Sequence, residues 1–166
     1  MRDRSAAAVG SSLFFLLAPG VVAGLIPWLI TRWRVGVDYP WPVQAAGVVL
    51  FVAGAIVLVS AFVRFVTEGT GTPAPVAPTA KLVVGGLYRF VRNPMYLAVL
   101  AAIVGQALLF GRPALLGYGA AVAIAFVVFV RFYEEPTLLR TFGEEYEEYR
   151  RAVPGWWPRL RPWTPD

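Results

Sequence analysis

The sequence predicts an all-α integral membrane protein with about four transmembrane helices and a C-terminal amphipathic helix at the membrane surface. Of its 166 residues, 58% are hydrophobic and only 15% are charged, whereas soluble domains have about 25% charged residues. The charges are also segregated, and they leave four uncharged runs that each approach the length of helix needed to cross a bilayer. These runs are Ser11–Thr31, Trp41–Val63, Asn93–Gly111 and Pro113–Val130, of 21, 23, 19 and 18 residues.

The basic residues predict the orientation of these helices. Twelve of the fifteen Lys and Arg residues lie on one side of the predicted spans, and only Arg32, Arg34 and Arg112 lie on the other. Because basic residues accumulate on the cytoplasmic side, we expect both termini in the cytoplasm and the chain in the plasma (inner) membrane. The same charges favour contact with anionic membrane lipids. A nucleic-acid partner is not expected, since no basic stripe lies outside the membrane boundary.

The chain has neither Cys nor His. No disulfide, thiol nucleophile, imidazole base or metal site is therefore expected. Arg2 and Arg4, which precede the first apolar run, are typical of a signal peptide. However, that run contains Pro19 and Pro27 and lacks a clean small-x-small cleavage site. The sequence thus predicts a retained first helix.

The first two helices and the loop after them have distinct compositions. Gly20 and Gly24 form a small-xxx-small pattern, which lets a neighbouring helix approach closely. We expect the second helix to end near Val63, where Arg64 reaches the cytoplasmic face. Thr67–Ala80 then has two glycines and three prolines in fourteen residues, which favours extended backbone. Composition alone leaves open whether this segment is a tether or a lid over a cofactor.

The third and fourth helices are separated by only three residues, Gly111–Pro113, and should form a tight hairpin that returns to the cytoplasm at Arg131. Beyond it, apolar residues recur at spacings of three and four opposite a Glu-rich face, which predicts one amphipathic helix on the membrane surface. Trp156, Trp157 and Trp163 are then expected at headgroup level. The apolar stripe comprises Leu138, Leu139, Phe142, Tyr146, Tyr149 and Val153.

Two polar clusters flank the hairpin. The first ends in Asn93-Pro94, a good N-cap and first-turn pair, and free N–H groups at such a helix start favour a carboxylate or phosphate. The second contains Glu134 and Glu135, adjacent carboxylates that are costly at a membrane helix end unless solvated or paired. Either cluster could be a plain helix boundary. The hairpin nevertheless brings both to the same end of two neighbouring helices, where they could form a cleft.

Such a cleft suits S-adenosylmethionine. Carboxylates can accept hydrogen bonds from its ammonium or ribose hydroxyls, and Tyr faces can attract its sulfonium. Methyl transfer requires mainly the alignment of nucleophile, methyl group and sulfur. A carboxylate acceptor would need no general base, which fits a chain without His or Cys.

Several segments of the sequence resemble a known family in order and spacing. Gly86–Tyr88, Arg92–Tyr96, Glu134–Leu138 and Phe142–Tyr146 are similar to segments of the isoprenylcysteine carboxyl methyltransferase family. Phospholipid methyltransferases share the wider pattern of these integral membrane enzymes. The resemblance covers residues 79–158 within a single domain of residues 1–166.

The resemblance implies S-adenosylmethionine-dependent methyl transfer to a hydrophobic or lipid-like acceptor within the membrane. We also expect Arg131 and Glu135 to take part in catalysis, with Arg131 holding any acidic group of the acceptor. Tyr88 and Tyr96 should flank the sulfonium. The residues implied to bind the cofactor are Lys81, Leu82, Val83, Tyr88, Asn93, Pro94, Met95, Tyr96 and Glu134.

Two positions depart from the family pattern. Asn93 stands where the family usually has His, so a His contact becomes an Asn hydrogen bond. Val130 stands where the prenylcysteine enzymes have an Arg that holds the substrate carboxylate, which argues against prenylcysteine itself as the substrate.

Two other functions compete with this prediction. The first is an NADPH-dependent membrane reductase of the related sterol reductase fold, whose cofactor phosphates would need more Arg and Lys than the Glu134-Glu135 pair offers. The second is a non-enzymatic helical bundle, in which an ion path is unsupported because Gln44 and Gln106 are the main polar exceptions within the helices. The sequence leaves open the acceptor atom (O, N or S) and the oligomeric state.

Overall fold

A computed structural model describes residues 18–69 and 81–164, and the regular elements within these ranges are all helices. Short 3-10 and π-helical turns, η1 to η3, separate some of the α-helices. In chain order the elements are η1 (Val21–Leu25), α2 (Ile26–Thr31), α3 (Trp41–Gly69), η2 (Gly86–Arg89), α4 (Pro94–Leu109), α5 (Ala114–Phe129), η3 (Val130–Glu134), α6 (Glu135–Phe142) and α7 (Glu144–Ala152).

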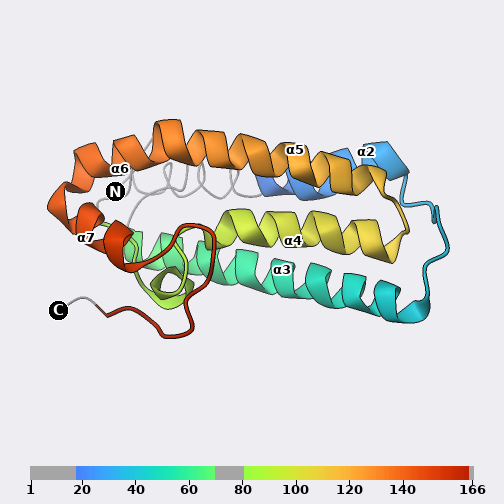
Figure 1. Cartoon of the computed structure of the whole chain (residues 1–166), viewed down its shortest axis with the longest axis horizontal. Helices are drawn as coiled ribbons and strands as arrows, with labels where there is room; N and C mark the ends of the chain where they lie inside the picture. Colours follow the sequence, from blue (N-terminus) through green and yellow to red (C-terminus); the bar gives the residue numbers. More distant parts are fainter. Residues whose placement is uncertain (1–17, 70–80, 165–166) are drawn as a thin grey trace, which may run out of the picture.

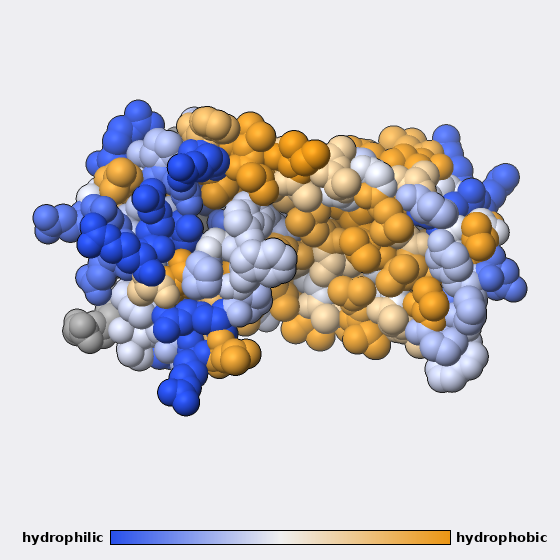
Figure 2. Space-filling view, viewed as in Figure 1, coloured by the Kyte–Doolittle hydropathy of each residue, from blue (hydrophilic) through white to orange (hydrophobic). Residues whose placement is uncertain are grey.

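The helices lie side by side along the long axis of the molecule (Figure 1). Two are long and apolar enough to cross a membrane, Trp41–Arg64 and the continuous helix Ala114–Phe142. Two shorter apolar helices, Ala18–Thr31 and Pro94–Leu109, accompany them. Figure 2 shows an apolar band between two polar ends, as expected of a protein surrounded by lipid. The all-helical prediction is confirmed, and two of the four predicted spans have full membrane length among the described residues.

Helices α3 and α4 touch along their backbones. A Cβ atom added at Gly47, Gly54 or Gly105 would lie 2.6–2.7 Å from a backbone atom of the opposite helix. Small residues permit this close packing, which stabilises helix pairs in membranes. No described atom lies within 4 Å of such a Cβ at Gly20 or Gly24. The predicted small-xxx-small pattern of the first helix is therefore not where the described helices approach most closely.

A proline explains the polar residue buried in α4. Pro27 has no N–H, so it cannot donate to the carbonyl of Ala23, four residues earlier, or to that of Val22, five residues earlier. Gln106 Nε2 donates to the Ala23 oxygen at 2.7 Å, and the Tyr118 hydroxyl donates to the Val22 oxygen at 2.8 Å. Unpartnered carbonyls at membrane depth would cost several kcal/mol. Gln106 and Tyr118 therefore connect the first helix to α4 and α5 through hydrogen bonds.

The fourth predicted helix does not end at Arg131. It passes through the π-turn η3 into α6 and ends only at Phe142. Pro136 alone favours the start of a new helix, but the π-turn inserts an extra residue and the helix continues through the proline. The expected end of the second helix at Arg64 is also wrong, since α3 continues to Gly69.

The predicted helix on the membrane surface is replaced by two helices that face the protein. Gly143, with φ of +53°, separates α6 from α7. Tyr146, Tyr149 and Val153 are then at most 3% exposed and pack against Tyr88 rather than facing lipid. The Tyr149 hydroxyl donates to the Tyr88 carbonyl at 2.7 Å. Burial raises the pKa of Tyr149, so this hydroxyl stays protonated as a donor.

Candidate active site

The two predicted polar clusters meet at the end of the molecule that carries α6 and α7. The Tyr96 hydroxyl, in the first turn of α4, donates to Glu134 Oε2 at 2.8 Å. The Tyr96 ring lies 4.6 Å from Phe126 and 6.3 Å from Trp156, measured between ring centroids. The Tyr96 ring thus packs against two aromatic side chains, and its hydroxyl orients the Glu134 carboxylate. Glu134 Oε1 has no hydrogen-bond donor among the described residues and can accept a hydrogen bond from a ligand.

Asn93 occupies the N-cap position of α4, and Pro94 follows in the first turn, as predicted. The Asn93 side chain makes no capping bond, however, so its expected capping role is wrong. It is only 6% exposed, and its Nδ2 has no hydrogen-bond partner within the described residues. A buried donor without an acceptor costs about 1–3 kcal/mol. Gly155 packs against this amide, because a Cβ atom added to Gly155 would lie 3.4 Å from Asn93 Nδ2.

The segment before α4 supplies apolar walls. Val83 and Tyr88 belong to a buried cluster with residues of α7, and Leu82 and Met95 pack against it. Lys81 lies at the exposed edge of the segment. The structure therefore gathers most of the predicted cofactor-binding residues of this segment into one cluster, with the lysine at its rim.

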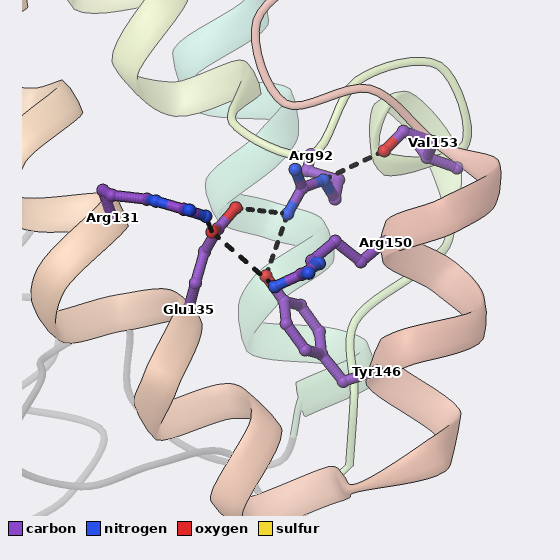
Figure 3. A network of polar contacts seen from close by, with 6 residues as sticks. All are labelled: Arg92, Arg131, Glu135, Tyr146, Arg150 and Val153. Carbon is purple, nitrogen blue, oxygen red and sulfur yellow. Dashed lines mark hydrogen bonds and ion pairs between the residues drawn. The ribbon is translucent and has the colours of Figure 1, made fainter.

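Glu135 lies at the centre of an arginine cluster, drawn in Figure 3. Its Oε1 accepts from Arg92 Nη1 at 2.8 Å, whereas Oε2 lies 3.3 Å from Arg131 Nη1 and 4.0 Å from Arg150 Nη1. The Glu135 and Arg92 side chains are 11% and 14% exposed, but the Arg131 side chain is 67% exposed. Glu135 is thus paired inside the protein, while most of Arg131 faces outward.

Arg92 also binds the C-terminal part of the chain. Its Nη1 donates to the Tyr146 hydroxyl and its Nε to the Val153 carbonyl, both at 2.9 Å. Its backbone N–H donates to the Pro154 carbonyl at 3.0 Å. Sequence reasoning missed this role, although Arg92 directly precedes Asn93 in one of the family-like segments. The missing information was the position of α7, which supplies Tyr146, and of the segment directly after it, which supplies Val153 and Pro154.

Comparison with known proteins identifies the family of this chain. Residues 43–145 match the phospholipid methyltransferase family. The chain is 31% identical over 71 residues to a phosphatidylethanolamine N-methyltransferase of Pyrenophora tritici-repentis (strain Pt-1C-BFP). That alignment covers 43% of this chain but only 8% of the relative.

No solved structure matches the chain. The family match includes both polar clusters, the one at Asn93 and the one at Glu134. It confirms the predicted resemblance to membrane methyltransferases. Because the match extends over well over half of the sequence, the chain belongs to the phospholipid methyltransferase family.

Proposed function

We propose that this protein transfers a methyl group from S-adenosylmethionine to the amine of a phospholipid headgroup. The family supports a lipid acceptor, and the name of the Pyrenophora relative supports an amine. The observation that carries the proposal is the Tyr96–Glu134 hydrogen bond, which joins the two family-like clusters. Asn93, in the same cluster as Tyr96, adds a buried Nδ2 that has no hydrogen-bond partner among the described residues. Family membership favours this function over an NADPH-dependent reductase or a non-enzymatic bundle.

The polar atoms of the site fit the proposed cofactor. Asn93 Nδ2 is a buried donor that can bond to a carboxylate or ribose oxygen. Glu134 Oε1 can accept from an ammonium or a ribose hydroxyl. The rings of Tyr88 and Tyr96 offer faces that attract a sulfonium. The remaining residues predicted to contact the cofactor are Lys81, Leu82, Val83, Pro94 and Met95.

When bound, the cofactor would supply an electrophilic methyl group for the amine lone pair, with its thioether as the leaving group. The amine must first lose its proton. Water takes this proton in the proposal, because Glu134 Oε2 accepts from the Tyr96 hydroxyl and Oε1 is assigned to the cofactor. The buried residues contribute mainly orientation, which alone can supply a large part of a rate enhancement.

Arg131 binds the phosphate of the lipid acceptor in this proposal. Arg131→Ala should raise the apparent KM for phosphatidylethanolamine vesicles several-fold, as loss of an exposed charge pair of up to about 1 kcal/mol implies. The KM for S-adenosylmethionine should change little. The measurement is transfer of labelled methyl from cofactor to lipid by the purified protein.

Arg140→Ala is the matched control, because Arg140 is an exposed arginine of α6 that, among the described residues, bonds through its side chain only to Thr137. Equal effects of the two substitutions would refute the role of Arg131. Saturable binding of NADPH without binding of S-adenosylmethionine to the native protein would refute the function itself.

The proposed topology places both termini in the cytoplasm of the plasma membrane. Because the chain has no Cys, single cysteines can report each side. The segment between α2 and α3 and the segment after α7 lie at opposite ends of the molecule (Figure 1). Val35 in the first segment and Leu160 in the second are 65% and 99% exposed. An impermeant thiol reagent added outside intact cells should label Val35→Cys and not Leu160→Cys. The reverse labelling pattern would invert the topology.

The proline-rich segment Thr67–Ala80 lies almost entirely outside the described residues. Its closure over the cofactor therefore stays a prediction, with a simple tether as the alternative.

A further inference from the structure

Arg92 connects four parts of the chain through one buried side chain and its own backbone. Its guanidinium contacts Glu135 on α6, Tyr146 on α7 and the Val153 carbonyl after α7. Its backbone N–H reaches the Pro154 carbonyl. A planar guanidinium with several directed donors fixes its partners in one geometry better than a lysine can.

The position of this ion pair along the sequence matters. Arg92 directly precedes Asn93, and Glu135 directly follows Glu134. The contact between Arg92 and Glu135 therefore fixes the separation of the two backbones that carry the proposed cofactor ligands. Removing one partner of a buried pair leaves the other charge uncompensated, so the contact resists opening.

Glu135 has little capacity left for a substrate. One of its oxygens accepts from Arg92 at 2.8 Å, and the other faces Arg131 at 3.3 Å and Arg150 at 4.0 Å. Glu134 differs, because within the described part of the chain only its Oε2 accepts a hydrogen bond, from Tyr96. Adjacent carboxylates thus have different surroundings and suit different roles.

We propose that Arg92 and Glu135 are positioning residues of the methyl-transfer site, which hold Asn93 and Glu134 at the separation needed to bind the cofactor. This inference rests on the proposed function and replaces the expected catalytic role of Glu135. It also assigns α7 and the segment after it the role of holding Arg92. Nearly all of this region follows residue 145, where the family match ends. Tyr146 and Val153 hold the guanidinium from its other side.

Glu135→Gln tests the proposal, since it removes the charge and keeps the size of the side chain. The dissociation constant for S-adenosylmethionine should rise about 10- to 100-fold, the range typical of losing a group that orients a ligand-binding residue. The kcat on phosphatidylethanolamine vesicles at saturating cofactor should be largely retained. Such a split indicates lost binding geometry rather than a lost chemical step.

Glu147→Gln is the matched control. Glu147 forms a 2.7 Å ion pair with Arg151 on the same end of the molecule, and both side chains are well exposed, at 44% and 76%. This variant should bind the cofactor like the native protein. Tyr146→Phe, which removes only one hydroxyl partner of Arg92, should raise the dissociation constant several-fold and decides the question if Glu135→Gln does not fold.

Two results would overturn the proposal. Unchanged cofactor affinity in folded Glu135→Gln, or in Tyr146→Phe if the first variant is unfolded, would show that the pair does not position the site. Loss of kcat with unchanged affinity would make Glu135 a catalytic residue. Failure of the proposed function looks different, because the native protein would then show no saturable binding of S-adenosylmethionine.

Discussion

A valine in place of Gly105 is expected to destabilise the helix bundle by roughly 1–3 kcal/mol or more. A Cβ at this position would lie 2.7 Å from the backbone nitrogen of Phe51 and 2.8 Å from the carbonyl oxygen of Gly47. Both are backbone atoms, so no change of rotamer relieves the contact, and α3 and α4 must move apart. The shift would also displace Gln106, the next residue, from the Ala23 carbonyl that it satisfies.

The thermal unfolding midpoint of the detergent-purified protein measures this effect. Gly117→Val on α5 is the control, because no described atom lies within 4 Å of a Cβ at Gly117. Both variants introduce the same β-branched residue into a helix, so their helix propensities change equally. A Gly105→Val protein that unfolds at the same temperature as Gly117→Val would refute the close packing of α3 against α4.

Hydropathy and charge predicted the helices and the hairpin well, because lipid leaves a membrane helix few alternatives. The turn between α4 and α5 lies where Gly111 was expected to mark it, and this glycine has a φ of +56°. Which glycines meet a neighbouring helix depends instead on how each helix is rotated. The sequence therefore favoured Gly20 and Gly24. The close contacts instead occur at Gly105 on α4 and at Gly47 and Gly54 on α3.

Two prolines lie within helices that continue past them, for a related reason. Pro136 predicts a break when its helix is considered alone, yet α5 and α6 are continuous. The helix around Pro27 likewise persists because Gln106 and Tyr118 donate to the freed carbonyls. Such partners come from other helices. The sequence pattern around a proline therefore cannot predict them.

The amphipathic stripe had a similar ambiguity. Its periodicity shows that one face must be covered, but lipid and protein both cover an apolar face. The tyrosine hydroxyls distinguish the two cases, since Tyr146 and Tyr149 each find a partner inside the protein. In the site, the hairpin predicted that the two polar clusters lie at the same end, and the Tyr96–Glu134 hydrogen bond joins them. The role of Arg92 depended on α7 and could not be predicted.

Glu134→Gln is expected to weaken binding of S-adenosylmethionine by roughly 1.5–3 kcal/mol, or about 10- to 150-fold. The amide oxygen of Gln can still accept from the Tyr96 hydroxyl, which is 2.8 Å away from the native carboxylate. The fold around the site should therefore survive. What is lost is the negative charge offered to an ammonium or ribose hydroxyl. Equilibrium binding of labelled cofactor to the purified protein measures the change.

Tyr96→Phe separates the charge of Glu134 from its orientation. This variant keeps the carboxylate and the ring contacts with Phe126 and Trp156, and removes only the hydrogen bond that orients Oε2. Cofactor affinity should then fall less than in Glu134→Gln, because a charge-assisted contact with the ligand is stronger than a bond that only orients it. If folded Glu134→Gln binds the cofactor as tightly as the native protein, Glu134 is a solvated boundary charge. If instead Tyr96→Phe has the larger effect, the tyrosine rather than the carboxylate contacts the cofactor.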